Sequence, residues 1–148
     1  EKRQARMTEF KIFDEATIDS KNIRFIVFCD EQGVEKSHEI DDLDMPKKAK
    51  HIVMYENSKP VATSRFYKES GNTWHAGRIA VLKEMRGTGC GRKVLEKAEE
   101  EMKKLGAKEI FISAQTQARG FYESLGYKAY GDVYPEENIP HIAMKKKI

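Results

Sequence analysis

Cysteine is scarce in this sequence, and long apolar runs are missing from it. Only Cys29 and Cys90 occur among the 148 residues, too few and too far apart for a disulfide framework or a CxxC pair. No apolar run approaches the length that spans a bilayer, and the start of the chain lacks the apolar segment of a signal peptide. We therefore expect a protein of the reducing cytoplasm with no membrane partner.

The sequence also lacks a metal-binding motif and a dominant charge. The acidic residues between positions 39 and 44 do not have the spacing of a calcium loop, and no set of cysteines and histidines suggests zinc. The net charge of +3 is small beside 27 basic and 24 acidic residues, and there is no long basic tract beyond the three lysines at 145–147. We expect no metal and no nucleic-acid partner.

What the sequence does contain is enough apolar material for one domain, with 39% hydrophobic residues. We assign the domain to residues 7–148. The six residues before Met7 are expected to be an added segment or a disordered start. Hydrophobic patterns and turn residues predict strands and helices in the order strand, helix, three antiparallel strands, helix, strand, helix and two strands. The expected ranges are 10–13, 20–32, 51–55, 61–66, 74–81, 91–105, 109–113, 118–125, 127–130 and 139–144.

Several details of the helices are predicted from single residues. Asp19 or Ser20 is expected to cap the first helix, which should stop at Gly33. In the second helix, Leu105 is expected to belong to the apolar stripe that begins at Val94. On its wet side, pairs four residues apart should form between Glu99 and Lys103 and between Glu100 and Lys104.

The loop before the second helix is rich in glycine. It reads Arg86-Gly87-Thr88-Gly89-Cys90-Gly91 and separates a strand from a strongly helical segment. Glycine lets backbone N–H groups approach a ligand closely, and a helix N-terminus attracts anions, so a pyrophosphate would fit here. Arg92 and Lys93 after Gly91 exclude a Walker A loop, and Arg92 also stands where the dinucleotide fingerprint needs glycine.

Two motifs resemble those of one family. Arg86, Gly89 and Gly91 match the Arg/Gln-x-x-Gly-x-Gly/Ala loop of the GNAT family of N-acetyltransferases. The segment 121–127, Phe-Tyr-Glu-Ser-Leu-Gly-Tyr, resembles the Phe-Tyr-x-x-x-Gly-Phe/Tyr segment that closes the same family, and it begins 30 residues after Gly91. Segments 27–34 and 138–144 are similar to the small bacterial ElaA/YjcF-like branch. The resemblance implies an α/β GNAT fold with a mixed, mostly antiparallel sheet of six to seven strands and about four helices.

The resemblance also implies a cosubstrate site for acetyl-CoA. Backbone groups of Ile79 to Val81 would hold the pantetheine arm, with Ala80 between them, and the loop would bind the pyrophosphate. Tyr122 matches the tyrosine that protonates the departing thiolate in many members of the family, and homodimers are frequent there. Cys90 is interpreted as a small loop residue, and Phe121 is expected to do the packing on this helix. The full set for the cosubstrate is Ile79, Ala80, Val81, Arg86, Gly87, Thr88, Gly89, Cys90, Gly91, Arg92 and Tyr122.

The general base is open among several residues. The candidates are Glu31, Glu39, Asp41, Asp44, His51, His75 and His141. We name Tyr122, His141 and Glu31 as catalytic. Among the histidines, His141 is chosen because it follows Pro140, as in the suspected branch. If Glu31, Glu39 and Asp41 line the acceptor cleft, they favour a cationic acceptor. The expected reaction is transfer of acetyl from acetyl-CoA to a primary amine of a small molecule or peptide.

Two other functions are compatible with the same residues. An acyl-homoserine-lactone synthase-like enzyme would share the fold and use S-adenosylmethionine, although the intact loop at 86–91 argues against it. A non-catalytic sensor of acyl-CoA would bind through the same loop, and Tyr122 would then do no chemistry.

Overall fold

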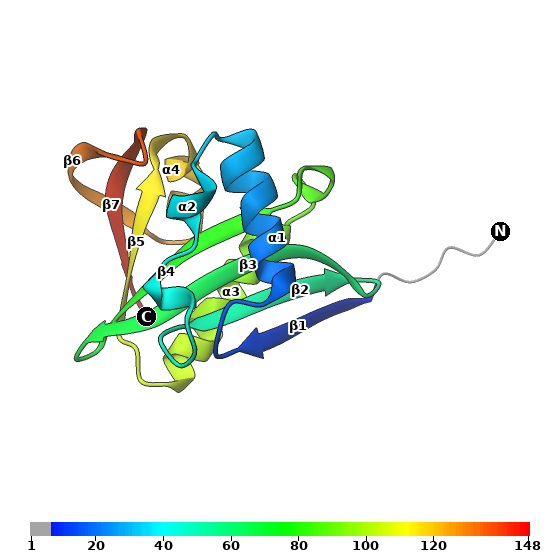
Figure 1. The fold of residues 1–148 in the computed structure, drawn as a ribbon. Coiled ribbons are helices and arrows are strands. Elements are labelled where there is room, and N and C mark those ends of the chain that lie inside the picture. Colours follow the sequence, from blue (N-terminus) through cyan, green and yellow to red (C-terminus); the bar gives the residue numbers. More distant parts are fainter. Residues whose placement is uncertain (1–6) are drawn as a thin grey trace. The chain divides into compact units, whose positions relative to one another are not determined.

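The computed structural model describes residues 7–148 and follows the expected order of strands and helices (Figure 1). Residues 1–6, the expected added or disordered start, lie outside the described residues. In chain order the elements are β1 (Thr8–Phe13), α1 (Ile18–Arg24), η1 (Phe25–Glu31), α2 (Lys36–Glu39), η2 (Asp42–Asp44), β2 (Lys50–Glu56), β3 (Lys59–Ser70), β4 (Thr73–Val81), η3 (Lys83–Met85), α3 (Cys90–Lys104), β5 (Glu109–Gln115), η4 (Thr116–Ala118), α4 (Arg119–Ser124), β6 (Lys128–Glu136) and β7 (Ile139–Lys147).

The strands form one mixed sheet of seven, in the order β1-β2-β3-β4-β5-β7-β6. β4 and β5 run parallel, whereas β1 with β2, β5 with β7 and β6 with β7 are antiparallel. The expected mixed α/β sheet is therefore confirmed. By their contacts the residues form two compact units. The first unit comprises residues up to 65 together with 78–98, and the second comprises 66–77 together with 99–148.

The first helix begins at Ile18, two residues earlier than expected. Thr17 is its N-cap, and the Thr17 and Ser20 side chains cap each other's backbone N–H groups in a capping box. The prediction that Asp19 or Ser20 is the cap is wrong, because Asp19 accepts a hydrogen bond from the Tyr55 hydroxyl at 2.7 Å instead. The helix continues as the π-helical η1 and ends at Gly33, whose φ of +79° suits glycine. The expected end is confirmed.

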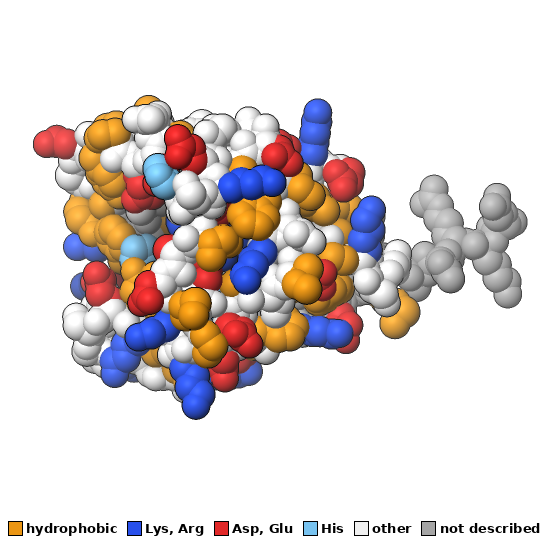
Figure 2. Space-filling model, viewed as in Figure 1, with side chains coloured by type: hydrophobic (Ala, Val, Ile, Leu, Met, Phe, Trp, Pro, Cys, Tyr) orange, Lys and Arg blue, Asp and Glu red, His pale blue; other side chains and the backbone are white. Residues whose placement is uncertain are grey.

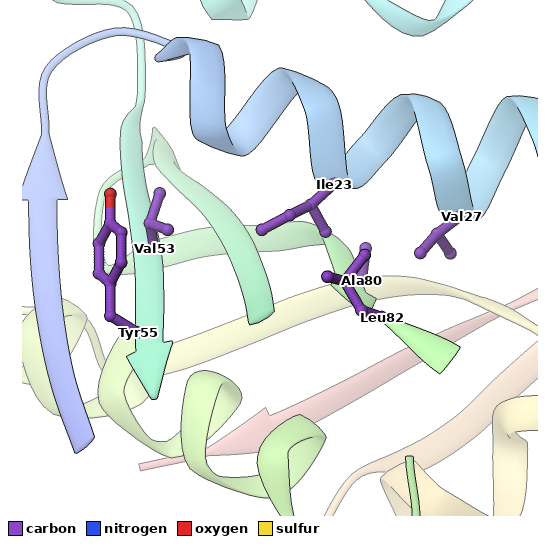
Figure 3. Close-up of a cluster of buried hydrophobic side chains, with 6 residues drawn as sticks. All are labelled: Ile23, Val27, Val53, Tyr55, Ala80 and Leu82. Carbon is purple, nitrogen blue, oxygen red and sulfur yellow. The ribbon is translucent and has the colours of Figure 1, made fainter. Parts of the chain in front are cut away.

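An apolar cluster joins this helix to the sheet within the first unit. Ile23 and Val27 point from the helix towards Val53 and Tyr55 of β2 and towards Ala80 and Leu82 at the end of β4 (Figure 3). All six side chains of this cluster are buried. Burying each of the larger ones stabilises the fold by roughly 1.5–3 kcal/mol. Because Ala80 belongs to this core, the cluster fixes the strand on which pantetheine binding was predicted.

α3 has the predicted apolar stripe but ends sooner than expected. Val94, Leu95, Ala98 and Met102 are fully buried, whereas Leu105 is 55% exposed. Leu105 follows the last helical residue, and Gly106 adopts a φ of +100°, so the chain has already turned away. The prediction that Leu105 packs in the core is wrong.

One of the two predicted charge pairs on α3 is present. Lys104 Nζ lies 3.3 Å from Glu100, as expected. Glu99, however, accepts hydrogen bonds from the Tyr127 hydroxyl at 2.6 Å and from Lys146 at 3.0 Å, within the second unit. No pair between Glu99 and Lys103 occurs in the part of the chain that the structure describes. A partner brought in by the tertiary fold has replaced the local one.

Two tight turns set the register of two hairpins. Asn57 and Ser58, between β2 and β3, both have positive φ, and so do Glu137 and Asn138 between β6 and β7. Two consecutive positive φ angles match the twist of flanking strands, which makes such turns efficient hairpin connections. The first hairpin joins β2 and β3, which cover the strands expected at 51–55 and 61–66. The second places Tyr134 opposite His141 and Glu136 opposite Ile139.

Residues 34–50, between the first helix and the sheet, contain α2, η2 and only the first residue of β2, and a buried arginine holds them in place. Arg24 is 1% exposed. Its Nε donates to Glu39 Oε2 at 2.9 Å and its Nη1 to Asp44 Oδ1 at 2.6 Å, while Nη2 donates to the Glu39 carbonyl at 2.7 Å. Hydrogen-bonded ion pairs of this kind offset the cost of burying charge. Arg24 thus ties the segment to the first helix.

Two more arginines complete the network from the sheet side. Arg65 of β3 pairs with Asp41 at 2.7 Å and with Asp44 at 3.1 Å. Arg78 of β4 pairs through Nε with Glu39 at 2.8 Å and through Nη2 with Asp41 at 3.3 Å. We call Arg24, Arg65, Arg78, Glu39, Asp41 and Asp44 the arginine network. Its three positive and three negative side chains balance, and it lies wholly in the first unit.

We expect Arg24→Met to destabilise the protein by about 3–5 kcal/mol, because it leaves buried Glu39 and Asp44 short of a partner. The free energy of unfolding in urea measures this. Arg119→Met is the matched control, since Arg119 pairs with Glu123 at 3.5 Å in an exposed position and should cost at most about 0.5 kcal/mol. Equal effects of the two substitutions would show that the network contributes little.

We also expect the free energy of unfolding to decrease as the pH is lowered, because of His51. Burial lowers the pKa of its imidazole from 6.5 to about 4 in the folded protein. Between these values the unfolded chain takes up a proton that the folded chain refuses, so stability is lost as the pH falls from 6.5 towards 4, by about 3 kcal/mol. Urea unfolding of His51→Gln across this range should show a flatter slope, whereas His38→Gln, at an exposed histidine, should keep the wild-type slope. A wild-type slope in His51→Gln would contradict the assignment.

Candidate active site

The glycine loop forms a strand-to-helix turn in the first unit. Gly87 and Gly89 have φ of +79° and +87°, a backbone region that other residues rarely adopt. A Cβ built at either position meets nothing within 4 Å, so the glycines serve the backbone conformation and leave the space above the loop open. The first N–H groups of the following 15-residue helix have no intrahelical acceptor. The loop therefore offers open space, free donors and a positive helix end together.

Side chains of the loop brace it from within. The Thr88 hydroxyl donates to the Met85 carbonyl at 2.6 Å and lies 3.3 Å from Cys90 Sγ. Cys90 is the first residue of α3 and is buried. Cys90, interpreted from the sequence as a small loop residue, therefore lies at the start of the helix and packs into the core. Gly91 lies within the first turn of α3, and Arg92, 50% exposed, has Glu96 at 4.0 Å.

Arg86 and Glu31, predicted for different roles, form an ion pair with each other. Arg86 Nη2 contacts Glu31 Oε1, and Arg86 Nε donates to the Val81 carbonyl at 3.1 Å. The guanidinium is thereby held at the end of β4, beside the start of the loop. Glu31 is occupied by this contact, which weakens its case as a general base. Its catalytic role remains a prediction.

The last part of β4 has a distorted backbone at Arg78. Its φ of +49° is unusual for a residue with a side chain and costs about 1–3 kcal/mol. Arg78 Nε is buried and makes no hydrogen bond of good angle within the described residues, although Glu39 lies 2.8 Å away. Beyond Arg78 the strand alternates, with Ala80 in the core and Ile79 and Val81 only half-buried.

Glu39 and Asp41, two of the three carboxylates considered for the acceptor cleft, form ion pairs with arginines. Glu39, Asp41 and Asp44 all belong to the arginine network, and Glu39 is only 3% exposed. Burial alone would raise the pKa of Asp44, but hydrogen bonds from Arg24 and the Asp41 N–H outweigh it and hold that pKa well below its usual range. Because Glu39 and Asp41 are both paired with arginines, little of their charge is left for a cationic acceptor, and their role in the acceptor cleft stays a prediction.

Two of the candidate histidines have structural contacts. His51 is 1% exposed and places Nε2 3.2 Å from the Leu43 carbonyl, next to the arginine network. His75, in the second unit, stacks on Tyr67 with ring centroids 4.9 Å apart and places Nδ1 2.8 Å from the Tyr67 hydroxyl. Packing accounts for both rings.

Tyr122 lies buried in α4, in the second unit. Its ring meets Phe121 edge-on at 5.2 Å and Tyr127 at 6.0 Å. Phe121 is 36% exposed and Tyr122 only 9%, so the expectation that Phe121 does the packing on this helix is wrong. Burial raises the pKa of the Tyr122 phenol to about 12. The hydroxyl is therefore protonated at neutral pH, as a proton donor must be.

His141 lies in a polar cluster that sequence patterns did not reveal. Its Nδ1 is 2.7 Å from the Ile139 carbonyl, its Nε2 is 3.4 Å from Glu136, and its ring stacks on Tyr134 at 6.2 Å. Ser113 of β5 hydrogen-bonds to the Tyr134 hydroxyl and, at 3.2 Å, to Glu136. Sequence reasoning missed Ser113, Tyr134 and Glu136. A recognised turn at 137–138 would have paired Tyr134 with His141.

The predicted residues thus fall into two groups. The first unit holds the glycine loop, residues 79–81 and Glu31, and the second holds Tyr122 and His141. On the face drawn in Figure 2, basic and acidic side chains are interspersed, in keeping with the small net charge. No helix in residues 7–148 is long and apolar enough to cross a membrane.

Comparison with known proteins adds independent evidence. Residues 21–148 match the family model described as acetyltransferase (GNAT) domain. YyaT of Bacillus subtilis is 38% identical over 127 residues, covering 85% of each chain. The N-acetyltransferase YjcF of the same organism is 34% identical over 134 residues, covering 90% of this chain and 94% of YjcF. The crystal structure of Escherichia coli ElaA superposes with a TM-score of 0.83 at 27% identity, covering 95% of this chain and 100% of ElaA.

The resemblance stated from the two motifs is confirmed, including the likeness to ElaA and YjcF. The match covers the glycine loop, Tyr122 and His141. This chain belongs to the GNAT acetyltransferase family.

Proposed function

We propose that the protein transfers the acetyl group of acetyl-CoA to a primary amine, directly and without a covalent enzyme intermediate. The observation that carries the proposal is the glycine loop at the N-terminus of α3, where two left-handed glycines leave open space before free N–H donors. A pyrophosphate suits such a turn, because backbone donors and the helix dipole both favour a diphosphate anion. Family membership supports the same cosubstrate.

Each part of the chain has a defined task in this reaction. Loop residues 86–91 would bind the pyrophosphate, Arg92 would add charge, and backbone groups of Ile79 and Val81 would hold the pantetheine arm as an added strand. The amine nitrogen attacks the thioester carbonyl carbon, a C–N bond forms and the C–S bond breaks. Tyr122 then donates its phenolic proton to the departing thiolate sulfur, and the amine gives up a proton to a base.

We infer that the protein acts in the cytoplasm and needs no metal, and a homodimer is the assembly expected from the family.

Calorimetric titration with acetyl-CoA, CoA and S-adenosylmethionine tests the cosubstrate directly. Selective binding of the CoA species supports the proposal. Binding of S-adenosylmethionine alone would favour a homoserine-lactone synthase-like enzyme, and no binding of any ligand would end the assignment of the loop.

We expect Gly89→Glu to weaken acetyl-CoA binding at least about tenfold, which corresponds to about 1.4 kcal/mol. The substitution puts a side chain and a negative charge into the space for the pyrophosphate and strains a backbone with φ of +87°. Gly71→Glu is the matched control, because Gly71 also has a positive φ and open space but lies in the turn between β3 and β4. If both variants bind acetyl-CoA equally well, the loop is not the phosphate site.

We expect Tyr122→Phe to lower kcat about 100-fold while the Kd for acetyl-CoA changes little. Loss of a general acid removes stabilisation that is needed only in the transition state, and the buried ring keeps its packing. Thiol release at saturating amine measures kcat, and calorimetry measures Kd. Tyr130→Phe, at an exposed tyrosine, serves as the control. An unchanged kcat in Tyr122→Phe would remove this hydroxyl from the mechanism, whereas acetyl-CoA binding by the wild type without any thiol release would favour a sensor of acyl-CoA.

A further inference from the structure

We propose that Ser113, Tyr134, Glu136 and His141 form the subsite that receives the acceptor, and that the acceptor enters as a primary ammonium. We call these four residues the amine subsite. This inference rests on the proposed acetyl transfer and adds to it the place and the charge of the acceptor.

Three neighbouring strands bring the four side chains to one face of the second unit. Tyr134 is opposite His141 across the β6–β7 ladder, and Glu136, two residues after Tyr134, points to the same side. Ser113 on β5 is opposite Ala143, two residues after His141. The register of β6 shifts between Tyr130 and Tyr134, as at a β-bulge. Bulges commonly re-aim side chains beside functional sites.

The charge of the subsite is what distinguishes it from the other acidic positions. Glu136 is 48% exposed, and among residues 7–148 it contacts Ser113 and His141 but forms no ion pair with a lysine or arginine. Glu39, Asp41 and Asp44 are by contrast each matched to arginines. A carboxylate without a cation, surrounded by groups that can accept hydrogen bonds, favours an ammonium ligand and disfavours an anionic one.

His141 is oriented to accept a proton in this subsite. Its Nδ1 faces the Ile139 carbonyl at 2.7 Å, and a carbonyl can only accept, so Nδ1 carries hydrogen. In the neutral ring Nε2 is then the acceptor, and it lies 3.4 Å from Glu136 Oε2. An ammonium held by Glu136 and the two hydroxyls would present one of its N–H groups to Nε2.

The proton balance follows from this arrangement. The ammonium transfers one proton to His141 Nε2 and becomes a neutral amine. Its lone pair forms the C–N bond to the acetyl carbonyl carbon as the C–S bond breaks, and Tyr122 protonates the sulfur. The second proton of the nitrogen leaves as the amide forms and, through solvent, restores the phenol of Tyr122, while His141 releases the first proton to solvent.

Binding of the amine can be followed without any turnover. We would record the imidazole signals of His141 by NMR while adding 1,5-diaminopentane to the protein saturated with CoA, which has no acetyl group to transfer. The signals should shift in a saturable manner in the wild type, and the apparent Kd should rise at least tenfold in Glu136→Gln. The matched control is Asp132→Asn, which removes a carboxylate from the same strand outside the cluster and should keep the wild-type Kd. No shift in the wild type, or equal Kd values in all three proteins, overturns the inference.

Kinetics with two amine sources complete the test. Glu136→Gln should raise KM at least tenfold for 1,5-diaminopentane or for a lysine-containing peptide with a blocked N-terminus, and the preferred source identifies the acceptor as a small molecule or a protein. Affinity for acetyl-CoA should stay at the wild-type value in this variant. If the wild type fails to bind acetyl-CoA, the proposed function falls. If it binds acetyl-CoA and acetylates amines while Glu136→Gln retains the wild-type KM, only the amine subsite falls.

Discussion

The structure of the first unit depends on the arginine network. Residues 34–50 contain little regular structure beyond α2 and η2, and the backbone hydrogen bonds among them join residues only three or four positions apart. Arg24 reaches them from the first helix, and Arg65 and Arg78 reach them from neighbouring strands. Breaking one such buried pair leaves another charge without a partner, so the six side chains stabilise the segment as a set.

The same network extends to the proposed cosubstrate site through Arg78. This residue has a left-handed backbone at the point where β4 leads into residues 79–81, and its guanidinium is fixed by Glu39 and Asp41. Strained backbone persists only where the surroundings over-determine it. The ion pairs thus provide the reason why β4 keeps its irregular shape, and that shape sets which backbone groups of Ile79 and Val81 are left for a ligand.

Local sequence patterns predicted the order of the elements well. The stripe from Val94 to Met102 and the glycines at 33, 106 and 126 mark helices and their ends through interactions a few residues apart. The resemblance carried by two motifs then supplied the fold. Thr17 was not predicted as the cap although its partner Ser20 is only three residues away. Asp19 and Ser20 are also residue types that favour the N-cap position, and the sequence does not distinguish them from Thr17.

Long-range contacts explain most of the errors. Glu99 exchanged its expected partner for Tyr127 and Lys146, which are 28 and 47 residues away in sequence. The burial of Tyr122 in place of Phe121 depends on how α4 packs against neighbouring strands. The hydroxyls and carboxylate around His141 come together only because a turn without glycine, at 137–138, sets the register. No helical or strand period encodes such pairings.

The contrast between two sets of carboxylates has a general consequence for locating the acceptor. Sequence reading identifies acidic residues by type and proximity, and by that criterion Glu39, Asp41 and Asp44 are the conspicuous group. Their charge is cancelled inside the fold by three arginines, two of which come from strands far along the chain. Glu136 has only Glu137 beside it in the sequence and is less conspicuous, yet in the fold its contacts are a histidine and hydroxyl groups and not an arginine. Attraction of a cation depends on the charge left after internal pairing, and on that measure the acceptor belongs with β6 and β7 and not with residues 34–50.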